Sequence, residues 1–190
     1  MHDKPRILRT TTVARTRLFQ VETVDLRFGN GAEVRYERLR NTTPGAVLIV
    51  PVRDDGQVLL IREYAVGTER YELGLPKGRI EPDEDPLTTA GRELMEEVGC
   101  GARSLEPLAT LTVAPGYFGH LTHLVLARDL YPARRPGDEP EPIEVVPWPL
   151  ARLDALLQRD DFTEARSIAA LFLARERLHP PHFEEETPHP

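Results

Sequence analysis

Cysteine is almost absent from this chain: Cys100 is the single one among 190 residues. One thiol cannot build a disulfide framework or a four-cysteine zinc ribbon within a chain, so both kinds of cross-linked domain are excluded. Free cysteine usually packs as a small hydrophobic side chain, and we expect that role for Cys100. A chain without disulfides is typical of a reducing compartment, so we expect a cytoplasmic protein.

Long hydrophobic runs are missing as well. The longest, residues 46–52, has seven residues and contains Pro51, whereas about 20 apolar residues are needed to cross a bilayer. The first ten residues, MHDKPRILRT, include no apolar signal-peptide core. We therefore expect neither export nor a membrane partner.

The chain also lacks an excess of positive charge. Its 24 lysines and arginines against 31 acidic residues give a net charge of −7 and a pI near 5.4. Such a chain is a poor partner for DNA and well suited to divalent cations. The apolar content of 40% is that of an ordinary globular protein, and the length suits one domain.

Hydrophobic periodicity predicts strands first, then a helix, more strands and two further helices. This order favours an α/β sandwich over a regularly alternating doubly wound fold. The expected strands cover residues 18–28, 32–40, 46–52, 57–64, 108–113, 120–127 and 143–148, and the expected helices cover residues 86–98, 150–158 and 162–178.

The central helix has clear start and stop signals and an unusual cluster of charge. Asp85 is a good N-cap, Pro86 suits the first turn, and Gly99 suits the left-handed position after the last. Three glutamates at spacing i, i+3, i+4 fall on one face, where like charges repel. A hard divalent cation would remove that repulsion; the alternative is a solvated acidic face. The three are Glu93, Glu96 and Glu97.

Residues 78–100 resemble the Nudix box, the loop–helix–loop signature of the Nudix hydrolase superfamily. The positions that match are Gly78, Glu84, Arg92, Glu93, Leu94, Glu96, Glu97 and Gly99, while Cys100 replaces the closing aliphatic residue. The resemblance implies a Nudix α/β/α sandwich with a mixed sheet and an N-terminal β-hairpin extension. It divides the chain into an extension for dimerisation (1–44), a hydrolase domain (45–178) and a disordered tail (179–190).

Outside the box, residues 14–19, 61–69, 71–74, 137–142 and 164–166 are similar to the ADP compounds hydrolase and ADP-ribose pyrophosphatase group of that superfamily. The resemblance implies a homodimer that hydrolyses the pyrophosphate bond of ADP-ribose, NADH or diadenosine polyphosphates and releases AMP. The cofactor it implies is Mg²⁺, with Mn²⁺ as a substitute.

The resemblance also assigns roles to residues. Arg92 orients the glutamates, Glu97 and Glu139 act in catalysis, and Glu139 is the candidate general base. The implied metal ligands are Glu93, Glu96, Glu97 and Glu141, and the implied substrate contacts are Arg62, Glu72, Tyr117 and Phe118. Simpler interpretations are a solvated acidic loop for Glu139 and Glu141 and core packing for the two aromatics.

Two other functions stay open at this point. One is a catalytically silent Nudix domain that senses ADP-ribose or NAD and regulates a partner; loss of a box glutamate would favour it, and all are present. The other is removal of NAD caps from RNA, which the acidic net charge disfavours. Zinc-ribbon NADH pyrophosphatases are excluded by the single cysteine.

Overall fold

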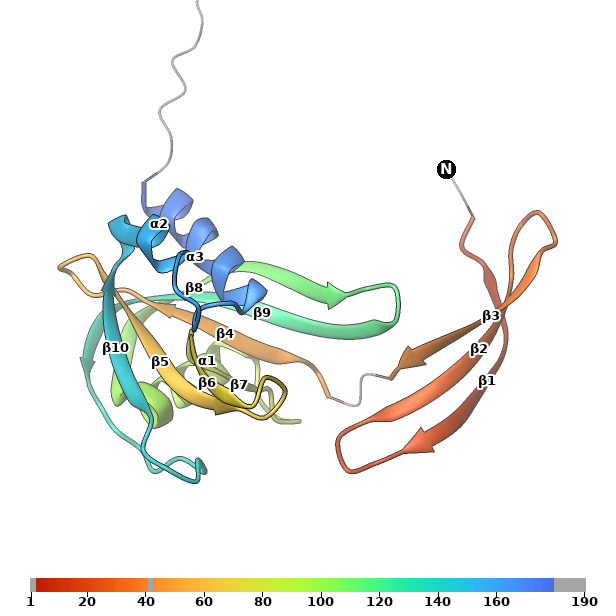
Figure 1. Ribbon diagram of the computed structural model, residues 1–190, viewed down its shortest axis with the longest axis horizontal. Coiled ribbons are helices and arrows are strands. Elements are labelled where there is room, and N and C mark those ends of the chain that lie inside the picture. The colour runs from red at the N-terminus through yellow and green to blue at the C-terminus, as the bar shows by residue number, and fades with distance from the viewer. Residues whose placement is uncertain (1–2, 41–42, 180–190) are drawn as a thin grey trace, which may run out of the picture.

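The computed structural model describes residues 3–40 and 43–179, which form a body of two sheets and several helices with an extension at one side (Figure 1). The larger sheet has the order β1-β2-β3-β9-β4-β7 with β8 paired to β9, and the smaller has the order β10-β5-β6. Within the described residues no helix is long and apolar enough to cross a membrane.

The strands are β1 (Arg6–Arg15), β2 (Gln20–Arg27), β3 (Glu33–Leu39), β4 (Ala46–Pro51), β5 (Gln57–Ala65), β6 (Arg70–Gly74), β7 (Lys77–Arg79), β8 (Cys100–Ala114), β9 (Phe118–Pro132) and β10 (Glu144–Pro149). The helices are α1 (Pro86–Glu93), which runs into a π-helical turn (Leu94–Val98), a 3₁₀ turn (Leu150–Arg152), α2 (Leu153–Leu156) and α3 (Ala165–Leu178).

Strand β4 is buried on both faces, which explains its unbroken apolar sequence. Val47 and Ile49 belong to the same core cluster as the buried residues of α1. Leu48 and Val50 face the opposite way, into a cluster that includes the apolar side of α3. Helices therefore cover both faces of the sheet, and the expected α/β fold with a mixed sheet is confirmed.

The extension is a three-stranded antiparallel sheet, β1–β3. The predicted hairpin of β2 and β3 is present, and β1 adds a strand that the sequence pattern did not predict. A fully buried carboxylate, Glu22, is paired there with Arg38 at 2.9 Å and Arg40 at 3.1 Å. The extension joins the body where β3 pairs in parallel with β9, at Leu39 and Phe118. The expected disordered tail lies outside the described residues except for its first, His179.

Several elements of the body differ from those predicted. The short strands β6 and β7 were not among the expected strands; β6 pairs with β5, and β7 pairs with β4. Strands β8 and β9 are each 15 residues long because they pair with each other far beyond their apolar segments. The helix expected over residues 150–158 is reduced to a 3₁₀ turn followed by the four residues of α2.

Candidate active site

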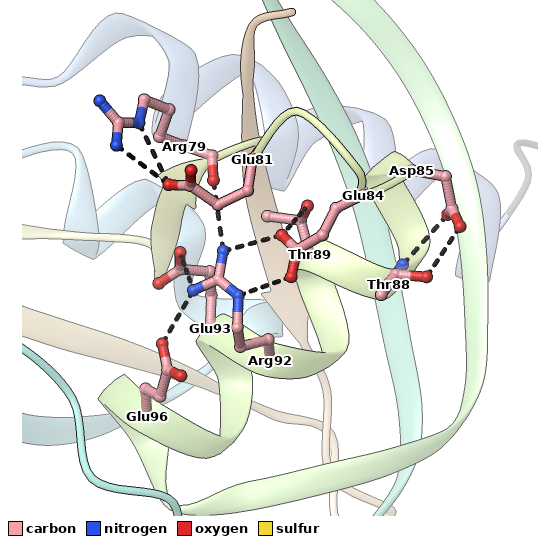
Figure 2. A network of polar contacts seen from close by, with 9 residues as sticks. All are labelled: Arg79, Glu81, Glu84, Asp85, Thr88, Thr89, Arg92, Glu93 and Glu96. Atoms are coloured by element: carbon pink, nitrogen blue, oxygen red, sulfur yellow. Dashed lines mark hydrogen bonds and ion pairs between the residues drawn. The ribbon is translucent and has the colours of Figure 1, made fainter.

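Arg92 lies at the centre of a carboxylate network at the end of α1 (Figure 2). Its Nη1 donates to Glu93 Oε1 at 2.7 Å and to Glu96 Oε2 at 2.9 Å. Its Nε and Nη2 donate to the two carboxylate oxygens of Glu84 at 2.9 and 3.0 Å, and Glu84 also accepts from the Thr89 hydroxyl. Arg92 thus binds three carboxylates, two of which, Glu93 and Glu96, belong to the glutamate cluster that the family resemblance expects it to orient.

Glu93 and Glu97 are buried although they carry ionisable groups, with 8% and 5% of their surface exposed. Burial raises the pKa of Glu93 to about 7 and the pKa of Glu97 to about 8. Arg92 opposes the shift at Glu93, and Lys77 opposes it at Glu97. Two buried carboxylates with raised pKa values are typical of a functional site.

The loop before α1 shapes the surroundings of both glutamates. The main-chain N–H of Lys77 donates to Glu97 Oε2 at 2.8 Å. A methyl group on the neighbouring Gly78 would lie 1.9 Å from Glu93 Oε1, so only glycine lets the backbone approach that carboxylate so closely. Strand β7 therefore contributes hydrogen bonding and close packing to the site.

A π-helical turn follows α1 and carries Glu96 and Glu97. The predicted caps are confirmed: Asp85 Oδ1 accepts from the N–H of Leu87 at 2.8 Å, and Gly99 adopts φ 78°. The N–H of Gly99 donates to the carbonyl of Leu94, an i to i+5 bond that widens the turn. Such turns occur frequently at functional sites.

The carboxylate cluster lines one cavity, and a second cavity shares two of the residues that line the first. The larger, about 770 Å³, is strongly polar, and the smaller, about 350 Å³, is mostly apolar. Glu63 and Lys77 line both. The larger is lined by Arg17, Glu63, Lys77, Gly78, Arg79, Glu81, Arg92, Glu93, Glu96, Glu97, Pro136, Gly137, Asp138, Glu139 and Pro140. The smaller lies between β5, β6 and the start of α3 and is lined by Ile61, Glu63, Tyr64, Ala65, Thr68, Glu72, Leu73, Gly74, Leu75, Lys77, Thr163, Glu164 and Ser167.

The donor set of the larger cavity fits a hard divalent cation. Its carboxylates outnumber its cations, and oxygen ligands are what Mg²⁺ and Mn²⁺ prefer. Glu93 and Glu96 accept bonds from Arg92, and Glu97 from Lys77. Among the described residues no three acidic, histidine or cysteine side chains are preassembled as ligands. A bound cation would therefore compete with Arg92 and the Lys77 N–H for these oxygens.

Glu139 and Glu141, on the loop between β9 and β10, are placed differently. Glu139 lines the cavity of the box glutamates, and its charge helps to raise the pKa of Glu93. Glu141 lies outside that lining, with its Oε1 accepting a 2.6 Å hydrogen bond from the Tyr71 hydroxyl. The structure thus brings the predicted base to the cluster and leaves the predicted fourth ligand on its margin.

Of the two predicted substrate contacts on β5 and β6, only Glu72 lines one of the cavities. Arg62 is held in ion pairs with Asp161 at 2.6 Å and Glu144 at 3.0 Å, outside the lining of both cavities. Glu72 lines the smaller cavity, where it accepts from Arg70 at 2.9 Å. Arg62 was expected at the substrate because of the family resemblance, and sequence alone does not show that Glu144 on β10 and Asp161 before α3 bind it.

Tyr117 and Phe118 lie at the turn between β8 and β9, and neither lines either cavity. Tyr117 is 59% exposed, and the ring of Phe118 stacks on that of His120 at 5.4 Å. The carbonyl of Tyr117 accepts from the N–H of Leu39. Within one chain these aromatics join the extension to the body and are not brought to the carboxylates.

Three residues that line the larger cavity were not predicted as site residues: Arg17, Glu63 and Lys77. Arg17 comes from the turn between β1 and β2, so the extension reaches the site. Each had a signal in the sequence: Arg17 and Glu63 lie in segments that resemble the family outside the box, and Lys77 directly precedes the box.

Comparisons with known proteins agree with this geometry. Residues 5–38 match the NudE-type Nudix hydrolase N-terminal domain, and residues 42–172 match the NUDIX domain. The chain is 56% identical over 175 residues to the ADP compounds hydrolase NudE of Escherichia coli K12, covering 92% of this chain and 94% of that protein. It is 29% identical over 171 residues to the ADP-ribose pyrophosphatase of Bacillus subtilis 168, covering 86% and 91%.

A crystal structure of an ADP compounds hydrolase has the same fold, with a TM-score of 0.88 and 54% sequence identity. The match covers 94% of this chain and 96% of that one, so it includes the extension as well as the body. These matches confirm the family that the resemblance of residues 78–100 to the Nudix box indicated. The chain belongs to the Nudix hydrolase family.

Proposed function

We propose that this protein is a Mg²⁺-dependent pyrophosphatase of ADP-containing compounds, with Mn²⁺ as a substitute, that releases AMP. The observation that carries the proposal is the pair of buried glutamates, Glu93 and Glu97, beside a polar cavity that shares Glu63 and Lys77 with an apolar one. Similarity to an ADP compounds hydrolase and an ADP-ribose pyrophosphatase supports the substrate class.

The two cavities suit the two parts of such a substrate. The pyrophosphate belongs in the polar cavity with the divalent cation, and an apolar ring with its ribose belongs in the cavity lined by Tyr64 and Leu73. Glu72 offers that half a carboxylate acceptor. The substrate would thus lie across the junction between the cavities.

The residues divide the chemistry among them. Glu93, Glu96 and Glu97 would hold the cation, which neutralises phosphate oxygens and acidifies water when bound. Arg92 keeps Glu93 and Glu96 in position. Glu139 faces the same cavity from the opposite loop and would take the proton of the attacking water. Positioning and charge neutralisation carry most of the catalysis in phosphoryl transfer.

We also propose that the protein acts as a cytoplasmic homodimer. The single cysteine supports the compartment. The exposed apolar side chains of the extension support self-association.

The alternative, a catalytically silent sensor, is disfavoured by the glutamates of the box. Glu84, Glu93, Glu96 and Glu97 are all present, and Glu93 and Glu97 are buried. A protein that only binds its ligand would have no need for all four.

The proposal is tested by turnover of a substrate panel with Mg²⁺: ADP-ribose, NADH, diadenosine polyphosphates and a GDP-sugar, with products identified by chromatography. AMP release from the ADP compounds is expected, and its absence from all of them would refute the proposal. Binding of ADP-ribose without turnover would instead support the sensor.

A further inference from the structure

Lys77 occupies an unusual position between the two cavities. Four cations line the polar cavity: Arg17, Lys77, Arg79 and Arg92. Of these, Lys77 also lines the apolar cavity. Its ammonium is therefore located where the charged and the uncharged halves of a ligand would meet.

The partners of these cations separate their roles. Arg92 is bound by Glu84, Glu93 and Glu96, and Arg79 by Glu81. Arg17 lines the polar cavity and not the apolar one. Among the described residues, Lys77 Nζ forms one ion pair, with Glu63 Oε2 at 2.5 Å, and both side chains are partly exposed, 36% and 43%. An exposed ion pair of this kind contributes little to stability, so its exchange for another anion costs little.

The backbone of Lys77 is held by hydrogen bonds, while its ammonium pairs with Glu63, which lines both cavities. Its N–H holds Glu97, and two residues earlier the N–H of Leu75 donates to the hydroxyl of Ser167 at 3.1 Å. The ammonium thus sits on a rigid support next to a carboxylate that the proposed mechanism uses.

The residue type is also informative. Among the 24 lysines and arginines of the chain only Lys4 and Lys77 are lysines. Lysine presents a compact charge with rotatable donors, which can pass from a carboxylate to a phosphate with little geometric constraint, whereas arginine prefers a fixed fork.

We propose that Lys77 is the phosphate-binding cation at the junction of the two cavities, and that Glu63 holds its ammonium until a pyrophosphate displaces the carboxylate. This inference rests on the proposed function for its substrate class and names the residue that positions the pyrophosphate. Because the contact uses the side chain, substitution of Lys77 leaves the main-chain bond to Glu97 in place.

The scarcity of lysine permits a direct test. Reductive ¹³C-methylation keeps the charge and labels Lys4, Lys77 and the N-terminal amine, and the K4R and K77R variants assign the NMR signals. Titration with inorganic pyrophosphate and with α,β-methylene-ADP in Mg²⁺ buffer is expected to shift the Lys77 signal and leave that of Lys4 unmoved. Adenosine should leave both in place. A Lys77 signal that stays unchanged at calorimetric saturation with these phosphates overturns the inference.

Kinetics distinguish a substrate contact from a structural role. K77M should raise KM for ADP-ribose about tenfold or more, since a charge-assisted hydrogen bond is lost. K77R keeps the charge and should restore part of the affinity. A fall in kcat with unchanged KM would mean that Lys77 acts through Glu97 and would overturn the inference.

Glu63 provides the complementary variant. E63Q should tighten binding of α,β-methylene-ADP severalfold in the wild-type background and have a clearly smaller effect in K77M, because the two residues are coupled. Equal effects in both backgrounds would count against the exchange. The pyrophosphate titration needs no nucleotide turnover, so failure of the proposed function and failure of this inference are seen separately.

Discussion

The α-carbon of Gly78 lies directly against the carboxyl group of Glu93, so that a methyl group at Gly78 would stand 1.9 Å from Glu93 Oε1. No side-chain atom can occupy that distance without displacing the carboxylate. Arg92 Nη1 donates to the same oxygen at 2.7 Å. Glu93 is therefore confined by both a backbone and a guanidinium.

Gly78→Ala is expected to lower kcat for ADP-ribose at least about tenfold, because Glu93 must leave its place and with it the proposed cation site. Gly29→Ala, where nothing lies within 4 Å of the added methyl group, is the matched control and should keep full activity. Steady-state kinetics at saturating Mg²⁺ measure both. An unaffected Gly78→Ala enzyme would show that Glu93 need not be confined.

Glu97→Gln is expected to lower kcat about a hundredfold or more, on the order of 3 kcal/mol of transition-state stabilisation, while the fold survives. Glu97 faces the polar cavity with Glu93, and an amide is a poor ligand for a hard cation. The measurement is kcat with ADP-ribose, with circular dichroism as the check on folding. A loss smaller than tenfold would contradict the assignment as a metal ligand.

Glu139→Gln is expected to depress kcat strongly with little change in KM or in Mg²⁺ dependence, because a proton acceptor acts in the transition state. Glu141→Gln should keep more than about a third of the wild-type kcat, because Glu141 is bound to Tyr71 outside the polar cavity. Both variants are assayed over a range of Mg²⁺ concentrations.

If Glu141→Gln lowers kcat and high Mg²⁺ reverses the loss, the result would support the metal-ligand role that the family resemblance implies for Glu141. If both variants stay active, the loop of Glu139 and Glu141 is a solvated acidic segment, and the base must be another group.

Stability of the metal-free protein should fall as the pH rises from about 5 to about 8. The pKa of Glu97 is raised from an ordinary 4.5 to about 8 in the fold. Between these values the folded state binds the extra proton, so deprotonation favours unfolding as the pH increases. Urea unfolding in EDTA, compared with Glu97→Gln, isolates the contribution of Glu97: the variant should show a flatter dependence. Identical pH profiles would refute the expectation.

Sedimentation should give about twice the 21.5 kDa chain mass. The extension exposes apolar side chains, among them Val34 at 41% and Tyr36 at 46%, and such side chains tend to be covered by a partner. Tyr36→Asp should shift the protein toward monomer. Val66→Asp, on the turn after β5 and 83% exposed, is the control and should stay dimeric. A fully active wild-type monomer would disprove the proposed assembly.

Local patterns predicted the central helix and its glutamates well. Asp85 and Gly99 act through neighbouring backbone groups, and the spacing of Glu93 and Glu97 is a property of one turn. What the pattern did not give is the π-helical geometry of that turn, because a wider turn leaves no mark in apolar periodicity.

Local patterns could not show which other residues line the polar cavity. Lys77 on β7 pairs with Glu63 on β5, and Arg17 lies in the extension. The ion pair that holds Arg62 could not be predicted, because its partner Asp161 lies 99 residues away in the sequence. Contacts of that kind depend on tertiary arrangement and not on local spacing.

The parallel pairing of β4 with β9 sets the order in which the chain can fold. Ala46 pairs with Thr122, whereas β1–β3 and the β8–β9 hairpin pair neighbouring segments. Such local pairings form quickly, and pairing between distant segments is slow. During synthesis the extension can therefore form first, whereas the apolar strand β4 cannot pair with β9 until β9 has been synthesised. That interval, more than the finished fold, is when the chain is exposed to aggregation.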